Sequence, residues 1–475
     1  MDNFTLVIVG ITSNLAQLKL IPTLYDLVAS GHMPKVYKII GIGRTPMDNS
    51  IFTDFVDHVL HTPNRHHTHN IDQKIQAELM SHLTYLPADL TSADSYRILA
   101  DTLSDAPANR LFYLATFPSL YESIFTNLKK AELINETKDS WIRLMIEKPI
   151  GHDEDSAREL NTLLTSHFRE DQLFRLDHYL GKETLQNILT FRFGNGLLEP
   201  LMNSEFIDHI QVTAAEDFGI GARGSYYDQT GSLKDVGQNH LLQMIALATM
   251  DAPASYKTQD IMVKRIEAIE SLVPEPDTLV LGQYEGYLNE KDVSPLSVKD
   301  TYFAFKTHLE KTRFAGIPIY VRGGKQLART ATEITIVFKN SSKRVLSHLP
   351  GGESPNVLTY RLQPNEGIVL KMLTKVPGHE LKVEESYMQY CYPSDKDLPD
   401  AYERLIIDAI RGDQTFFNDS REVEAQWRFT DTLYTAVTGS PEVYKKGSWG
   451  PEKSEKMIQK DGRSWFEPSI AFCNF

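Results

Sequence analysis

Apolar residues in the first part of the chain come alternately in short continuous runs and in stretches with helical spacing. The runs at residues 4–10 (FTLVIVG) and 36–43 (VYKIIGIG) each end in glycine, which is typical of a buried strand that leads into a turn. From Leu15 onward, apolar residues recur every three or four positions, as on the buried face of a helix. Further strand-like and helix-like stretches follow at 83–87, 91–104, 110–116, 118–131 and 141–146. Strands that alternate with helices predict a Rossmann-like, doubly wound parallel sheet, an α/β domain.

The first helix has candidate caps and an internal proline. Thr12, Ser13 and Asn14 all precede it and carry side-chain oxygens that can cap a helix. Pro22 lies within the helical pattern, so it either shifts the start of the helix or bends it.

The second part of the chain has a different pattern, in which strand-like segments dominate. They are joined by turns that contain glycine or proline, and lie at 207–213, 301–309, 317–322, 332–338, 357–363 and 367–374. Helix-like stretches occur at 182–192, 234–249, 400–411 and 420–438. This pattern predicts a larger α+β domain with a mostly antiparallel sheet and helices on one face. We place the boundary at residue 177, which divides the chain into domains 1–176 and 177–475.

Composition and charge narrow the classes of function. The chain has 475 residues and a formal net charge of −14, so it offers no dominant basic face for a nucleic acid. No apolar stretch approaches the roughly 20 residues of a membrane-spanning helix, and the N-terminus does not read as a secretion signal. Two cysteines are too few for a disulfide framework or a zinc ribbon, which fits a reducing compartment. We therefore expect a cytoplasmic protein.

The turn between the first strand and the first helix, residues 10–16 (GITSNLA), is a candidate phosphate-binding corner. Free N–H groups at the start of a helix face such a turn and bind phosphate. The turn contains a single glycine, and Ser13 stands where a second glycine would let the backbone approach a pyrophosphate. On these residues alone, an ordinary strand-to-helix turn is the alternative interpretation.

Arg44 and Thr45 directly follow the second strand-like run. An acidic residue there would bind ribose hydroxyls, whereas an arginine accommodates a 2′-phosphate; the alternative for Arg44 is a solvated loop charge. We interpret domain 1–176 as a dinucleotide-binding domain that favours NADP without excluding NAD. The predicted coenzyme-binding residues are Gly10, Thr12, Ser13, Asn14, Leu15, Arg44, Thr45 and Lys148.

Two segments of the chain concentrate ionisable side chains. Residues 175–183 (RLDHYLGKE) contain Asp177, His178 and Lys182, and residues 235–243 (DVGQNHLLQ) place His240 at the head of an apolar, helix-like run. An acid, two imidazoles and a lysine are suited to binding a phosphate and removing a proton nearby. A lone histidine on an apolar helix is more often a core residue. A functional role for His240 is therefore inferred only together with the polar residues near it.

These segments resemble the glucose-6-phosphate dehydrogenase family, and the similarity runs from about residue 4 to about residue 450 in the order of the family. The motifs that carry it are RLDHYLGKE, EKPIGHD at 147–153, GSYYDQTGSLKDVGQNHLLQ at 224–243, AGIPIYVRGGKQL at 315–327, YERLIIDAIRGD at 402–413 and EVEAQWR at 422–428. The chain departs from the family in GITSNLA and in Phe117-Pro118-Ser119. These departures concern coenzyme preference more than the chemistry at the sugar.

The resemblance implies an NADP-linked oxidation of glucose 6-phosphate at C1 to 6-phosphogluconolactone, the first step of the oxidative pentose phosphate pathway. It implies that His240 is the general base and that Asp177 orients its imidazole. It assigns substrate binding to Lys148, His178, Tyr179, Lys182, Glu216, Asp235, Lys325 and Arg329. The domain 177–475 would then bind the substrate and form a homodimer.

Two other readings remain open. One is a sugar oxidoreductase that acts on a non-phosphorylated sugar, although a neutral substrate has no use for the basic residues around Lys182. The other is a catalytically silent sugar-phosphate sensor, which the single glycine of the coenzyme turn would suit. A histidine cluster (His58, His61, His66, His67 and His69) lacks an accompanying cysteine; we read it as a solvated surface segment and expect no metal.

Overall fold

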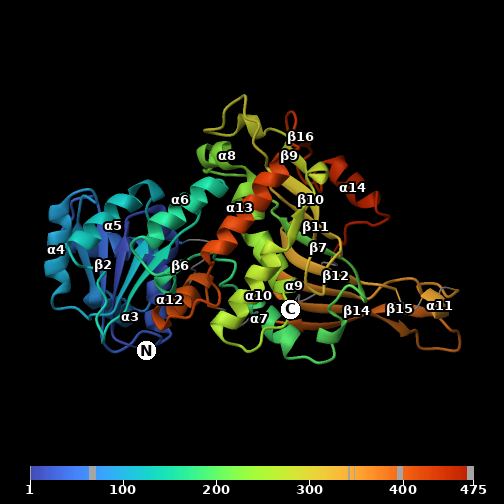
Figure 1. Ribbon diagram of the computed structural model, residues 1–475, viewed down its shortest axis with the longest axis horizontal. Coiled ribbons are helices and arrows are strands. Elements are labelled where there is room, and N and C mark those ends of the chain that lie inside the picture. The colour runs from blue at the N-terminus through green and yellow to red at the C-terminus, as the bar shows by residue number, and fades with distance from the viewer. Residues whose placement is uncertain (1, 64–70, 341–342, 347, 393–398, 468–475) are drawn as a thin grey trace. The chain divides into compact units, whose positions relative to one another are not determined.

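The computed structural model describes residues 2–63, 71–340, 343–346, 348–392 and 399–467 (Figure 1). The chain divides into two units, and each unit is assembled from three separate segments. Unit 1 comprises Met1–Ile150, Arg158–Gly181 and Pro399–Ser420. Unit 2 comprises Gly151–Ala157, Lys182–Leu398 and Arg421–Phe475.

Unit 1 is built on a six-stranded sheet in which every pair of neighbouring strands is parallel. The strand order is β3-β2-β1-β4-β5-β6. All six residues of β1 are buried, as expected for a parallel strand covered on both faces. The strands are β1 Phe4–Val9, β2 Tyr37–Gly43, β3 Leu83–Pro87, β4 Arg110–Leu114, β5 Ile142–Ile146 and β6 Leu173–Arg175.

The helices of unit 1 lie on both faces of this sheet (Figure 1). Helix α1 contacts α2, α3 and α12, whereas α4 contacts α5. The strand order reverses direction after β3, and right-handed crossovers then place α4 and α5 on the face opposite α1. The helices are η1 Ala16–Leu20, α1 Ile21–Ala29, α2 Asn49–His61, α3 Gln73–His82, α4 Ala93–Leu103, η2 Pro118–Leu120, α5 Tyr121–Lys130, α6 Glu154–Thr165, η3 Glu170–Gln172 and α12 Ala401–Arg411.

The predicted doubly wound parallel sheet is confirmed, and the proline shifts the start of the first regular helix. Residues Ala16–Leu20 form a short π-helical segment, and α1 begins only at Ile21. Pro22 is the second residue of α1, directly after this π-helical segment, so its missing N–H interrupts the hydrogen-bond ladder where the two segments join.

Unit 2 contains a ten-stranded mixed sheet of order β15-β14-β13-β12-β7-β11-β10-β9-β16, with β8 paired to β10. Only the β7–β11 and β9–β16 pairs are parallel among these strands, so the prediction of a mostly antiparallel sheet is confirmed. The strands are β7 Ile207–Ala215, β8 Leu272–Pro274, β9 Val280–Tyr284, β10 Tyr302–Leu309, β11 Ile319–Gly324, β12 Ala331–Phe338, β13 Val357–Gln363, β14 Gly367–Lys375, β15 Val383–Cys391 and β16 Glu442–Tyr444.

Helices pack on this sheet through apolar contacts. Helix α7 contacts β13, α9 contacts β12, and η5 contacts β7, β10 and β11; α9 and α10 lie alongside each other (Figure 1). The helices are α7 Glu183–Phe193, η4 Glu199–Leu201, α8 Gly224–Thr230, η5 Leu233–Leu241, α9 Leu242–Thr249, α10 Thr258–Glu270, η6 Pro276–Thr278, η7 Tyr287–Asn289, α11 Lys343–Leu346, α13 Ser420–Tyr434 and α14 Glu452–Gln459.

Several details differ from the sequence-based expectations, and helix α10 and strands β8, β9 and β16 also lie outside the predicted segments. The helix expected over 234–249 is divided into a π-helical part, η5, and a regular part, α9. Strand β15 was not expected: most of its residues are exposed, so it lacks an apolar pattern. Its last residue, Cys391, is disulfide-bonded, which the count of only two cysteines did not lead us to expect. In the described part of the chain, no helix combines the length and hydropathy needed to span a bilayer.

Candidate active site

The turn after β1 has the backbone of a phosphate-binding corner. Gly10 has φ +93°, and a Cβ atom there would lie 2.5 Å from the carbonyl oxygen of Ala115, so no other residue fits without displacing the chain after β4. The Ser13 N–H donates to the Gly10 carbonyl at 2.9 Å, and Ser13 Oγ accepts from the Ala16 N–H at 3.2 Å. Of the predicted caps, Ser13 therefore accepts a hydrogen bond at the start of the helical region.

Arg44 and Thr45 lie at the same end of the sheet as this turn. The two strands are parallel, with Val9 paired to Ile42, so Gly10 and Arg44 both follow the carboxyl ends of neighbouring strands. Arg44 and Thr45 are exposed. Gly43, which precedes them, lies close to the turn, because a Cβ atom there would be 3.2 Å from Thr12 Oγ1. A turn that requires glycine, next to an exposed guanidinium group, suits an anionic dinucleotide. Such ligands bind at the carboxyl ends of the strands in α/β sheets.

Lys148 follows the carboxyl end of β5, next to a carboxylate that the sequence interpretation overlooked. The Tyr113 hydroxyl donates to Glu147 Oε1 at 2.5 Å. Burial raises the pKa of Glu147, whereas its hydrogen bonds from Tyr113 and Tyr402 lower it. The signal was present in the sequence, because Glu147 directly follows the apolar run of β5.

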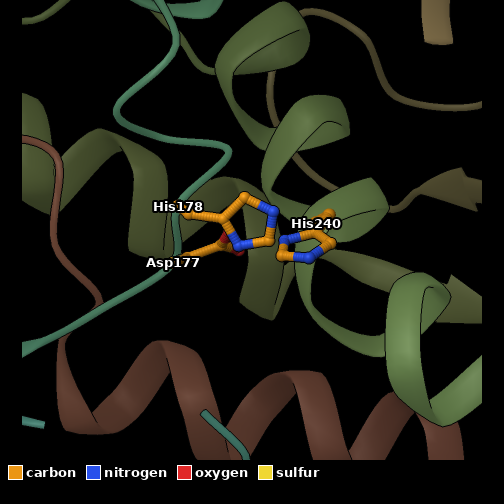
Figure 2. A group of neighbouring side chains, drawn as sticks. All are labelled: Asp177, His178 and His240. Atoms are coloured by element: carbon orange, nitrogen blue, oxygen red, sulfur yellow. The ribbon is translucent and has the colours of Figure 1, made fainter. Parts of the chain in front are cut away.

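The loop after β6 carries Asp177, His178 and Tyr179, and Figure 2 draws Asp177 and His178 on this loop and His240 on η5. Asp177 is 1% exposed, and its Oδ1 accepts from the Tyr179 N–H at 2.9 Å. The His178 ring stacks on Tyr402 with an interplanar angle of 10°. A Cβ atom on Gly181 would lie 2.6 Å from the Ala401 carbonyl oxygen, which explains the glycine at this point of the motif.

Lys182 stands at the N-cap position of α7 in unit 2. Its Nζ donates to Gln363 Oε1, the last residue of β13, at 2.7 Å. The charge of Lys182 also acts on the partly buried carboxyl group of Glu366.

Glu216 and Lys325 form an ion pair. They follow the carboxyl ends of β7 and β11, which are adjacent parallel strands with Ala215 paired to Gly324. Lys325 is 2% exposed, and its Nζ lies 5.2 Å from the ring centroid of Phe218 and 5.4 Å from that of Tyr227. Lys325 thus lies among aromatic rings, at the carboxyl ends of two adjacent parallel strands.

Asp235, on η5, is bonded by two neighbouring tyrosines of α8. The Tyr227 hydroxyl donates to its Oδ2 at 2.8 Å and the Tyr226 hydroxyl to its Oδ1 at 3.1 Å. Burial raises the pKa of Tyr227, and the charge of Asp235 raises it further. Tyr227 therefore connects Asp235 with Lys325, so the structure brings Glu216, Lys325 and Asp235 together.

His240 lies in the last turn of η5 and is 2% exposed. Gly237 lets this helix approach the sheet, because a Cβ atom there would lie 3.0 Å from Cζ of Phe303 in β10. Since η5 also contacts β7 and β11, His240 belongs to the helix that covers the strands bearing Glu216 and Lys325. A π-helical segment is uncommon and is frequent at functional sites.

Arg329 lies in different surroundings from Lys325. Its guanidinium lies 5.5 Å from the ring centroid of Trp449, and its charge acts on Glu333 of β12. Burial raises the pKa of Glu333 to about 7, while Arg361, Arg322 and Arg329 lower it. Arg329 is therefore one of the charged residues around the buried Glu333 on the sheet.

Part of the histidine cluster can be described. His58 and His61 are on α2, and His61 Nδ1 lies 3.4 Å from Asp57 Oδ1. His66, His67 and His69 lie outside the described residues.

Comparisons with known proteins give one consistent result over the whole chain. The family model described as "Glucose-6-phosphate dehydrogenase, NAD binding domain" matches residues 7–187. The model described as "Glucose-6-phosphate dehydrogenase, C-terminal domain" matches residues 189–466.

Relatives and solved structures agree with these matches. The chain is 36% identical to glucose-6-phosphate 1-dehydrogenase 2 of Mycobacterium tuberculosis strain H37Rv, covering 98% of this chain and 94% of that one. It is 36% identical to glucose-6-phosphate 1-dehydrogenase of Chlamydia pneumoniae, covering 97% and 95%. A crystal structure of the Mycobacterium avium enzyme superposes with a TM-score of 0.87 at 32% identity, covering 99% of this chain and 100% of that one. A glucose-6-phosphate dehydrogenase in complex with its substrate superposes with a TM-score of 0.89 at 32% identity, covering 98% and 99%.

Proposed function

We propose that this chain, which belongs to the glucose-6-phosphate dehydrogenase family, oxidises glucose 6-phosphate at C1 to 6-phosphogluconolactone. This reaction is the first step of the oxidative pentose phosphate pathway. One structural observation carries the proposal: Glu216 and Lys325 pair at the carboxyl ends of β7 and β11, and the helix that contacts both strands, η5, bears Asp235 and His240. Carboxylates that accept hydrogen bonds and a lysine that donates them suit the hydroxyl groups of a sugar.

His240 is the general base of the proposed reaction. Its imidazole takes the proton of the C1 hydroxyl, because a neutral imidazole is a base at physiological pH and burial limits competition from water. Asp177 orients the ring and stabilises the imidazolium that forms. Both groups are nearly inaccessible to solvent, with 2% and 1% exposure, which supports this assignment.

Recognition of the 6-phosphate falls to His178, Tyr179 and Lys182. Lysine supplies a point charge with three donors, and histidine and tyrosine supply further donors for phosphate oxygens. The stacking of His178 on Tyr402 supports this role, since it restrains the orientation of the imidazole ring.

The sugar hydroxyls are bound by the remaining polar residues. Glu216 and Asp235 accept hydrogen bonds, while Lys148 and Lys325 donate them. Arg329 belongs to this proposal through the family resemblance alone, and it lies beside Trp449.

The coenzyme is proposed to be NADP, with NAD as a slower second coenzyme. When bound, it accepts the hydride from C1. Gly10, Thr12, Ser13, Asn14 and Leu15 would hold its pyrophosphate, Arg44 and Thr45 its 2′-phosphate, and Lys148 would contact coenzyme and sugar. Domain 1–176 is then the coenzyme-binding domain, and domain 177–475 binds the substrate.

We further propose that the enzyme works as a cytoplasmic homodimer. Sugar phosphates and dinucleotides are charged metabolites that are retained inside cells, which supports this location. Assembly through domain 177–475 follows from the family resemblance, and sedimentation of the purified protein measures it.

The proposal is tested by following absorbance at 340 nm with glucose 6-phosphate and each coenzyme in turn. We expect reduction of NADP, with NAD slower. Equal rates with glucose and glucose 6-phosphate would favour a dehydrogenase of neutral sugars. No reduction of either coenzyme, with glucose 6-phosphate still bound in a calorimetric titration, would favour a sensor.

A further inference from the structure

Helix η5, which bears Asp235 and His240, begins without a cap from its own first residue. Ser232 occupies the N-cap position, and its side chain makes no capping hydrogen bond. The first N–H groups of a helix have no partners within the helix, so acceptors must come from elsewhere. Asp300, which is 67 residues from Leu233, supplies them.

Asp300 accepts a hydrogen bond through each of its three oxygen atoms, two from the start of η5 and one from α13. Its Oδ2 accepts from the Leu233 N–H at 2.7 Å, and its carbonyl accepts from the Ser232 N–H at 2.8 Å. Its Oδ1 accepts from the hydroxyl of Tyr434, the last residue of α13, at 3.2 Å. Asp300 is 2% exposed, and a carboxylate at a helix N-terminus is favoured by the helix dipole.

Gly231 makes this approach possible. It has φ +76°, and a Cβ atom at this position would collide with Oδ1 of Asp300. The glycine that precedes η5 is therefore required both by its backbone conformation and by the carboxylate beside it.

The residue after Asp300 is bonded to a second part of the site. The Lys325 N–H donates to the Thr301 carbonyl at 2.9 Å, and the Thr301 N–H donates to the carbonyl of Gly282 in β9 at 2.8 Å. The dipeptide Asp300–Thr301 is thus anchored to the sheet and bonds the start of η5 on one side and the backbone of Lys325 on the other.

We propose that Asp300 is a positioning residue, which fixes the start of η5 and thereby sets His240 and Asp235 relative to Lys325. The inference rests on the proposed role of His240 as general base. Asp300 acts through the helix and not by touching the substrate. Its removal therefore displaces the base, and a displacement of about 1 Å costs on the order of 10²-fold in rate.

The test compares the Asp300→Ala and Asp300→Asn variants with the unmodified enzyme. For Asp300→Ala we expect kcat to fall about 10- to 100-fold, with a much smaller change in KM for glucose 6-phosphate. Asp300→Asn recovers most of the rate, because its amide oxygen still accepts from the Leu233 N–H. The deciding readout is the deuterium isotope effect on kcat with glucose 6-phosphate deuterated at C1. A misplaced base makes the chemical step limiting and raises this effect, whereas a loss of folded enzyme leaves it unchanged.

Asp251→Ala is the matched control, since it removes a carboxylate from the loop after α9 that bonds Arg313; its isotope effect should equal that of the unmodified enzyme. The proposal is overturned if Asp300→Ala keeps kcat within twofold or loses rate with an unchanged isotope effect. Should Asp300→Ala not fold, Gly231→Ala decides by the same readout, because its Cβ displaces the Asp300 carboxylate while retaining it. If His240→Asn keeps full turnover, the general-base role of His240 is wrong. If His240→Asn loses turnover but the Asp300 and Gly231 variants keep the kcat and the isotope effect of the unmodified enzyme, only the positioning role of Asp300 is wrong.

Discussion

The Tyr227 hydroxyl donates a hydrogen bond of 2.8 Å to Oδ2 of Asp235, and the same tyrosine ring lies 5.4 Å from Nζ of Lys325. One side chain thus adjoins an acidic and a basic residue of the proposed sugar site. A charged group that loses a buried hydrogen bond is left poorly solvated, at a cost of about 1.5–3 kcal/mol.

Tyr227→Phe should therefore raise KM for glucose 6-phosphate by about tenfold, because the Asp235 carboxylate loses a donor that orients it. Steady-state kinetics at saturating NADP measures the change. Tyr284→Phe is the control, since its hydroxyl donates to Glu290 and not to Asp235. Equal effects of the two substitutions would mean that Tyr227 matters only for packing.

His240→Asn should lower kcat by about 10²–10⁴-fold, the usual contribution of a general base, because an amide cannot take the C1 proton. Binding of glucose 6-phosphate, measured by calorimetric titration, should change little. Unchanged turnover would remove His240 from the mechanism.

Lys182→Ala should raise KM for glucose 6-phosphate by about 10- to 100-fold, the range for a hydrogen bond to a charged group. Any activity with glucose should be unaffected, because glucose has no phosphate for the ammonium group to bind. Lys311→Ala, at an exposed lysine of unit 2, is the matched control. A variant that discriminates between the two sugars as the unmodified enzyme does would contradict the phosphate assignment.

Arg44→Ala should raise KM for NADP by about tenfold or more and leave KM for NAD within about twofold. The reason is that NAD lacks the 2′-phosphate that the guanidinium would bind. Arg97→Ala provides a comparison, since Arg97 is an exposed arginine of α4. Equal losses with both coenzymes would show that Arg44 contributes to stability and not to preference.

Glu333→Gln should change how stability depends on pH. Burial raises the pKa of Glu333 from the ordinary 4.5 to about 7, so the folded chain holds this proton more firmly than the unfolded chain. The resulting stabilisation is fully present below about pH 4.5 and is lost as the pH rises through about 7. The glutamine variant lacks this dependence, so its free energy of unfolding should improve relative to the unmodified protein between pH 5 and pH 8.

Urea unfolding at a series of pH values measures this difference. Glu310→Gln, at an exposed position, should show no such trend. A constant difference between Glu333→Gln and the unmodified protein across this range would mean that Arg361 and its neighbours keep the carboxylate ionised throughout.

Local features of the sequence were sufficient for much of the fold. The apolar run of β1 and the glycine after it predict a buried strand and a tight turn, and both are present. Such predictions succeed because burial of a strand and the conformation of a glycine depend on a few adjacent residues. Strand β15 was not predicted, because most of its residues are exposed and show no apolar pattern.

Patterns along the chain were enough to predict the alternating strands and helices and the residue types for acid–base and phosphate chemistry. The folded chain was needed to show that Glu216 pairs with Lys325, 109 residues away, and that Asp300 bonds the start of η5. Both contacts depend on which strands become neighbours in the sheet, as β7 and β11 do. Strand pairing is stabilised by contacts between distant segments, and the periodicity of a single segment contains no information about its partner.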